Sequence, residues 1–146
     1  ESIESRWNAE HTMIYTYIEI ALSNLLKGTN AGDAVTVKLL GGAVGNIVTV
    51  MTGAPHFRTE EEILLFIRTV NQEPFADFPT VTGFAQGKFN IQTTPGANSK
   101  IVTRDISATE FVGGRQSQFL DGPLSLEAFV KMIQDELKNL NSRGAL

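Results

Sequence analysis

The chain has 146 residues, of which 42% are hydrophobic and 19% are charged, and its formal net charge at pH 7 is −4. This composition is typical of a folded globular protein and excludes a disordered chain, and the length fits one domain over residues 1–146. The acidic balance argues against a nucleic-acid partner, which usually binds a basic face, and the absence of cysteine excludes disulfides and thiolate zinc sites.

The sequence also bears on membrane insertion and on processing of the chain. No apolar stretch reaches the roughly 18 residues that a membrane-spanning helix needs, so we expect no membrane span. The first residue is Glu1 rather than methionine, so we expect a processed or trimmed product. Whether a signal segment preceded Glu1 stays open.

The first third of the chain reads as a loop followed by strands. Residues 1–12 are polar and mixed and are predicted to form an N-terminal loop. Residues 13–22 alternate β-branched and aromatic types, which predicts a strand. Turn formers follow at 27–33, and residues 34–40 alternate again. After several glycines, residues 47–52 predict a third strand.

Residues 59–70 fit two interpretations. Thr59 followed by Glu62 matches a helix capping box. The apolar run is only five residues long, however, and such a run favours a strand that is buried on both faces. We predict a strand over 59–69, keep a helix as the alternative, and place Glu60–Glu62 in a solvated turn. An ion at this acidic triplet stays open, although the triplet lacks the Asp, Asn and Gly pattern of a calcium loop.

The next segment predicts more β structure and then a long irregular stretch. Residues 71–79 hold two prolines and are expected to form a loop. Residues 80–85 and 87–92 predict two strands, or one strand bent at its glycines. Residues 100–106 predict the last strand. Residues 107–122 are glycine-rich and polar and are predicted to be irregular.

The end of the chain predicts an amphipathic helix over about 125–141, inside a C-terminal region 123–146. Its apolar residues step by three or four along one face: Leu126, Phe129, Val130, Ile133, Leu137 and Leu140. Ser125 is a natural N-cap, and Gly144 suits a position after the helix end. The one-sided stripe means that this helix packs on the sheet. We expect it to cover Tyr15 and Tyr17, which could otherwise form a binding face.

These elements predict a mainly β (α+β) fold. We expect a β core over 13–106, built as a small open β-barrel or a strongly curved antiparallel sheet of about six or seven strands. The single C-terminal helix closes it.

The stretch Gly41–Gly45 raises the question of a phosphate-binding loop. Such loops open a helix whose N-terminus holds the phosphates. Here the spacing is Gly-Gly-x-x-Gly, and Ile47–Val50 is strand material rather than a helix start. We therefore predict a glycine connection between two strands, with glycine needed for the backbone, and no cofactor.

Residues for catalysis or metal binding do not stand out. His11 and His56 are the only histidines, and neither has a second ligand at helical spacing. There is no Gly-x-Ser-x-Gly elbow, and a carboxylate pair would be visible only in space. We predict no catalytic and no metal-binding residue, and whether the protein is an enzyme stays open, with a non-enzyme favoured.

Several short segments follow one another in a familiar order: Leu25-Leu26-Lys27-Gly28, Gly41–Gly45, Gly53-Ala54-Pro55-His56-Phe57, Glu61–Phe66 and Ala85-Gln86-Gly87-Lys88-Phe89. In this order the chain resembles a group of uncharacterised bacterial exported proteins over most of residues 7–140. That resemblance implies a periplasmic, cell-surface or secreted location and no known activity. The order also resembles netrin-like modules and tissue inhibitors of metalloproteinases, which are β-barrels of the oligosaccharide/oligonucleotide-binding type. The chain lacks their cysteines, so their inhibitory edge is not implied.

The function expected from these observations is that of a non-enzymatic exported domain that binds a protein or an extracellular polymer. One alternative is a hydrolase-type or metal-dependent enzyme with a spatially assembled site. Another is a structural subunit of an extracellular assembly, joined through exposed strand edges, and the oligomeric state stays open. The candidate interaction surface is the exposed tip at Val44, Gly45 and Asn46, together with His56.

Overall fold

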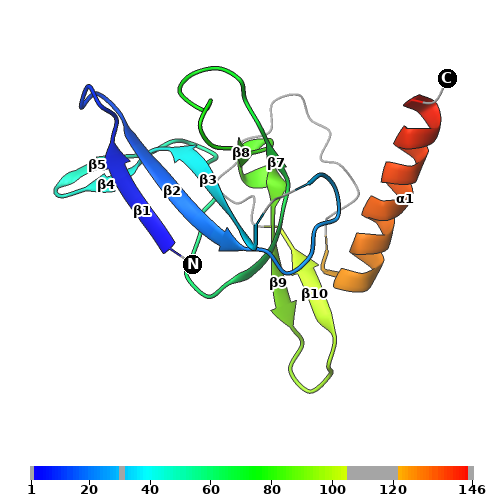
Figure 1. The fold of residues 1–146 in the computed structure, drawn as a ribbon. Coiled ribbons are helices and arrows are strands. Elements are labelled where there is room, and N and C mark those ends of the chain that lie inside the picture. Colours follow the sequence, from blue (N-terminus) through cyan, green and yellow to red (C-terminus); the bar gives the residue numbers. More distant parts are fainter. Residues whose placement is uncertain (1, 30–31, 105–121, 145–146) are drawn as a thin grey trace.

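The computed structural model describes residues 2–29, 32–104 and 122–144 (Figure 1). Over these residues the chain is mainly β with one C-terminal helix, as predicted. Eleven short strands form four antiparallel sheets, and they do not close into a barrel within the described residues. The strands are thus shorter and more numerous than the six or seven predicted.

The first sheet has the order β1-β2-β3, with β1 Ser2–Trp7, β2 Ile14–Ala21 and β3 Ala34–Leu40. The strands predicted at 13–22 and 34–40 are confirmed. The prediction of a loop over 1–12 is wrong, because β1 pairs with β2 along its whole length, from Ser2 opposite Glu19 to Trp7 opposite Ile14. β1 is an edge strand with mostly exposed, polar side chains, so it carries no hydrophobic signal of its own.

The two faces of this sheet are covered by different segments. One face buries Ile14, Ile18 and Val37 almost completely. On the other face lie Tyr15 and Tyr17, which were expected beneath the C-terminal helix. That expectation is wrong, because the proline-containing loop at 71–79 covers them with its own aromatic rings.

Two edge-to-face ring pairs join this loop to the sheet. The ring centroids of Tyr15 and Phe75 lie 6.1 Å apart, and those of Tyr17 and Phe78 lie 5.5 Å apart. Lys38 fastens the same loop, since its main-chain N–H donates to the carbonyl of Pro79 and its buried ammonium donates to the carbonyl of Pro74. The loop therefore acts as a lid over the tyrosine face.

The second sheet has the order β11-β10-β9-β6. Its strands are β6 Glu62–Leu65, β9 Lys88–Thr93, β10 Lys100–Thr103 and β11 Leu124–Ser125. A separate pair joins β7 Ile67–Arg68 to β8 Thr80–Val81. The strand prediction for 59–69 is confirmed as β6 and β7, and the helical alternative is wrong. The expected burial on both faces is also wrong, because Ile63–Leu65 are only half-buried and Phe66 and Ile67 are exposed.

Three predicted strands are shorter than expected. The one at 47–52 is the short strand β5, Ile47–Thr49. The one at 80–85 ends after Val81, and Phe84–Gly87 form a 3-10 helix that leads into β9. The last predicted strand, at 100–106, is described as β10 only to Thr103. The irregular segment predicted at 107–122 lies outside the described residues except for Gly122.

The C-terminal helix α1 spans Leu126–Gly144, so the helix is confirmed and Gly144 lies in its last turn rather than beyond it. Ser125 caps its start, because its hydroxyl accepts a hydrogen bond of 3.2 Å from the main chain of Ala128. Phe129 is buried against Phe89 and Val102 of the second sheet. Leu140, near the other end, is half exposed. The helix is thus anchored through its first half, and it rises beside the second sheet in Figure 1.

Candidate functional site

The glycine stretch folds into a β-hairpin. β4 (Gly42–Val44) and β5 (Ile47–Thr49) pair antiparallel, with Val44 opposite Ile47. Glycine is part of the first strand, and the connection is the two-residue turn Gly45-Asn46. This corrects the prediction that Gly41–Gly45 only connects two strands, although no helix follows it, as expected. Asn46 and Gly45 are exposed, and Gly45 has a left-handed φ of 58°, which suits the first position of such a turn.

Gly41 and Gly42 let this hairpin lie directly on the first sheet. The Gly41 N–H donates to the carbonyl of Ile14 at 2.8 Å, and the Thr16 hydroxyl donates to the Gly41 carbonyl at 2.7 Å. A Cβ atom at Gly42 would lie 2.4 Å from the side-chain oxygens of both Ser5 and Thr16. Only glycine allows so close an approach, so the position of the hairpin against β1 and β2 is fixed.

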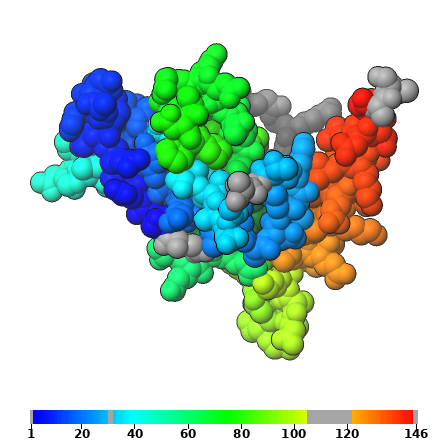
Figure 2. Space-filling view, viewed as in Figure 1, coloured from blue at the N-terminus to red at the C-terminus, as the bar shows by residue number. Residues whose placement is uncertain are grey.

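The hairpin exposes apolar side chains, those of Val48 and Val50 on its outer face and that of Ile47 on the opposite one. Ile47 is 53% exposed, Val48 65% and Val50, just after the strand, 82%. In Figure 2 the hairpin projects from the left side of the molecule. Exposed apolar residues that lie together are more informative than single ones, because they mark sites of interaction. The sequence pattern did not predict the exposure of these three residues, because a strand pattern does not show which face of the strand is covered.

The predicted interaction residues do not all belong to one place. Val44, Gly45 and Asn46 lie together at the hairpin tip, where Val44 is half-buried. His56 is exposed in the segment that follows β5, between buried Pro55 and half-buried Phe57. The hairpin is therefore the better-defined surface of the two.

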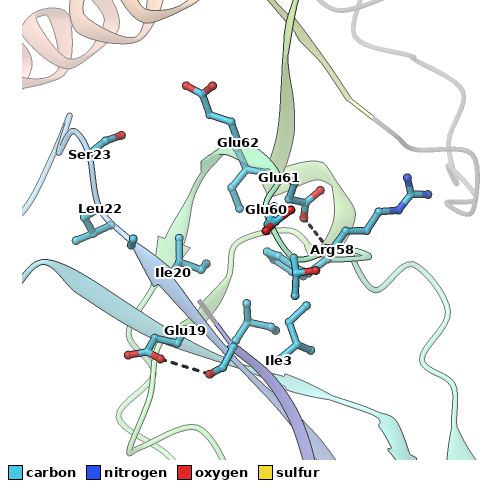
Figure 3. Close-up of a pocket in the computed structure, with 15 residues that line it drawn as sticks. Ile3, Glu19, Ile20, Leu22, Ser23, Arg58, Glu60, Glu61 and Glu62 are labelled. Carbon is cyan, nitrogen blue, oxygen red and sulfur yellow. Dashed lines mark hydrogen bonds between the residues drawn. The ribbon is translucent and has the colours of Figure 1, made fainter.

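A hollow of about 440 Å³ lies between the start of β1, the end of β2 and residues 57–63 (Figure 3). Its apolar wall is formed by Ile3, Ile18, Ile20, Leu22, Phe57 and Ile63. No histidine is among the described residues that line the hollow. His56 comes directly before Phe57, which does line it. The hollow therefore brings no imidazole base to a nucleophile.

Four glutamates and Arg58 also line this hollow. Glu61 forms an ion pair of 3.0 Å with buried Lys88 and accepts a hydrogen bond of 2.9 Å from the main-chain N–H of Arg58. Glu62 pairs with Lys100 at 2.6 Å. The prediction of a solvated turn therefore holds at Glu60 but not at Glu61, which is half-buried, or at Glu62, which begins β6. Lysines compensate much of the charge of the triplet.

Glu19 completes the rim, and its carboxylate accepts a hydrogen bond of 3.3 Å from the Ser2 hydroxyl. Across residues 2–29, 32–104 and 122–144, no group of three or more His, Asp or Glu side chains could hold a metal ion. The metal-dependent alternative therefore gains no candidate site from the described residues.

No protein-family model matches this chain, and neither a curated protein nor a solved structure matches it significantly. The two resemblances stated from the sequence therefore stay predictions. In the part of the chain that the structure describes, no helix is both long and apolar enough to cross a membrane.

Proposed function

We propose that this domain is a non-enzymatic binding module whose partner is another protein, and that the partner binds at the β4–β5 hairpin. The observation that carries the proposal is the exposure of Val48 and Val50 on one face of the hairpin and of Ile47 on the other. The hairpin projects from the molecule in Figure 2. Leaving these side chains in water costs free energy that a partner's apolar surface would recover, at about 25 cal/mol for each Å² buried.

The contact of the hairpin with the first sheet supports the same proposal. Gly41 and Gly42 hold it on Ser5 and Thr16, so the apolar side chains are presented on a framework that exists before binding. A surface that is already ordered loses less conformational entropy when a partner arrives. The resemblance to bacterial exported proteins adds an extracytoplasmic location to the proposal, and a domain that acts there would meet its partner in the envelope or the medium.

The test is a selection of a random peptide library on the immobilised domain. We expect it to yield peptides that lose at least tenfold in affinity for Val48→Lys and for Val50→Lys. Leu140→Lys is the matched control, because Leu140 is 50% exposed and lies on α1, away from the hairpin. Peptides that bind the hairpin variants as well as the wild-type domain, or a selection that yields none, would overturn the proposal.

A further inference from the structure

Within residues 2–29, 32–104 and 122–144, no strand pairs with the outer edge of β5. The two-residue turn makes Val44 and Ile47 a hydrogen-bonding pair. Along an antiparallel ladder the main-chain groups point alternately toward the partner strand and away from it. Those of Val48, opposite Ala43, therefore point away from β4. Among the described strands, β4 is the one that pairs with β5.

In the part of the chain that the structure describes, this edge lacks the usual protection against pairing. Natural edge strands are blunted by charged side chains, by proline or by a covering segment. From Leu39 to Phe57 the chain has no Asp, Glu, Lys or Arg, and β5 itself contains no proline. Val48 and Val50 follow the two-residue period of an extended chain, so their side chains leave on the same side and both are mostly exposed.

From these observations we infer that the partner binds as an added β-strand along β5, through the main-chain N–H and C=O of Val48. This inference rests on the proposed function and specifies its binding mode and partner chemistry. The occupant is an extended, uncharged segment of another protein, with apolar side chains at alternate positions that pack beside Val48 and Val50. Main-chain hydrogen bonds supply affinity in this mode, and the alternate side chains supply specificity.

A second copy of this chain is a poorer occupant. A specific interface buries at least about 1,000 Å² in total, and a strand of three residues contributes only part of that. Two copies joined only through their β5 strands would place two such short strands together. A longer foreign strand can continue past Thr49 beside Val50 and bury more surface.

The experiment separates the main chain of Val48 from its side chain, with peptides from the library selection as the probe. Val48→Pro removes the outward N–H and leaves the bonds between β4 and β5 in place, because proline is tolerated at such edge positions. Val48→Thr keeps the N–H and the branched shape. We expect Val48→Pro to weaken peptide binding at least tenfold more than Val48→Thr does.

A second measurement uses the wild-type domain and does not depend on the folding of any variant. Saturation with a selected peptide should slow hydrogen exchange at the Val48 amide. An unchanged exchange rate at this amide would overturn strand addition.

The remaining outcomes distinguish this inference from the proposed function. If Val48→Pro binds like wild type while Val48→Lys does not, only side chains are recognised, which overturns strand addition and leaves the proposed function intact. Peptides that bind every hairpin variant equally overturn both. If sedimentation shows a dimer of the free protein that Val48→Pro dissociates, the occupant is a second copy and our choice of a foreign strand is wrong.

Discussion

The hydroxyl oxygen of Ser5 lies 2.8 Å from that of Thr16, and β4 crosses directly over this pair. Thr16 donates its own hydrogen to the Gly41 carbonyl, so Ser5 is the donor to Thr16. This short chain of hydrogen bonds joins β1, β2 and the hairpin, and it leaves no room for a side chain at Gly42.

We therefore expect Gly42→Ala to destabilise the fold by about 2–4 kcal/mol, because the new methyl group meets both oxygens and the φ of 136° strains any residue other than glycine. Urea denaturation measures the change. Gly144→Ala is the control, since nothing lies within 4 Å of a Cβ there and alanine suits the helical backbone of α1. It should cost less than about 1 kcal/mol. A similar cost for both variants would mean that the hairpin is not seated on Ser5 and Thr16.

The elements predicted best from the sequence are those whose structure depends on their own residues rather than on distant partners. The alternation in β2 and β3 and the helical stripe around Phe129 are local patterns, and each corresponds to a buried face. The N-cap at Ser125 is also local, and the structure confirms it. Helix or strand was harder to decide at 59–69, where a capping pattern competes with a short apolar run.

What the sequence could not predict depends on distant partners. β1 is a strand because β2 pairs with it, and Tyr15 is covered because the 71–79 loop returns over it. For the candidate site, the tip at Val44–Asn46 was identified, but the exposure of Val48 was not. The absence of charge from Leu39 to Phe57 was visible in the sequence, but it does not tell which of these side chains are exposed.

The buried position of Tyr15 predicts a loss of stability in alkali. Burial is the largest cause that raises the pKa of Tyr15 above its ordinary value of 10.0, and the charges of Tyr17, Glu10 and Glu73 add to it. Below a pH of about 10, both the folded and the unfolded chain keep this proton. Above it the unfolded chain releases the proton first, so the free energy of unfolding falls as the pH rises toward the folded pKa.

Tyr15→Phe should remove this part of the decline. Because lysines also titrate in alkali, the quantity to measure is the difference between the two proteins in urea denaturation, at about pH 9 and about pH 11. We expect the wild-type protein to lose more stability than Tyr15→Phe over this interval. Equal losses of unfolding free energy in the two proteins would show that burial does not raise the pKa of Tyr15.

The anchoring of α1 through its first half predicts an uneven response to truncation. The ring centroids of Phe129 and Phe89 lie 4.8 Å apart, and Phe129 is buried. Phe129→Ala should cost about 3–5 kcal/mol, as for other large buried rings. Leu140→Ala, at a half-exposed site of the same stripe, should cost less than about 1 kcal/mol. Equal costs in thermal or urea denaturation would mean that the helix packs along its whole length.

Two Lys–Glu pairs beside the hollow should contribute differently to the free energy of unfolding, because they differ in burial. Lys88 is 7% exposed and its Nζ binds both Glu61 and Asn90, whereas Lys100 and Glu62 are both more than 40% exposed. Removing one partner of a buried pair leaves the other charge without compensation, and Lys88→Ala should therefore cost about 3 kcal/mol. An exposed pair is weakened by water and salt, so Lys100→Ala should cost less than about 1 kcal/mol.

A double-mutant cycle makes this comparison quantitative. The coupling energy of Lys88 with Glu61, from the single variants to alanine and their combination, should exceed that of Lys100 with Glu62. Added salt should reduce the coupling of the exposed pair more strongly, because solvent ions screen charges at the surface better than buried ones. If both couplings are equal and fall together with salt, Lys88 is solvated in solution, and the segment that carries Glu61 is not held against β9 by this pair.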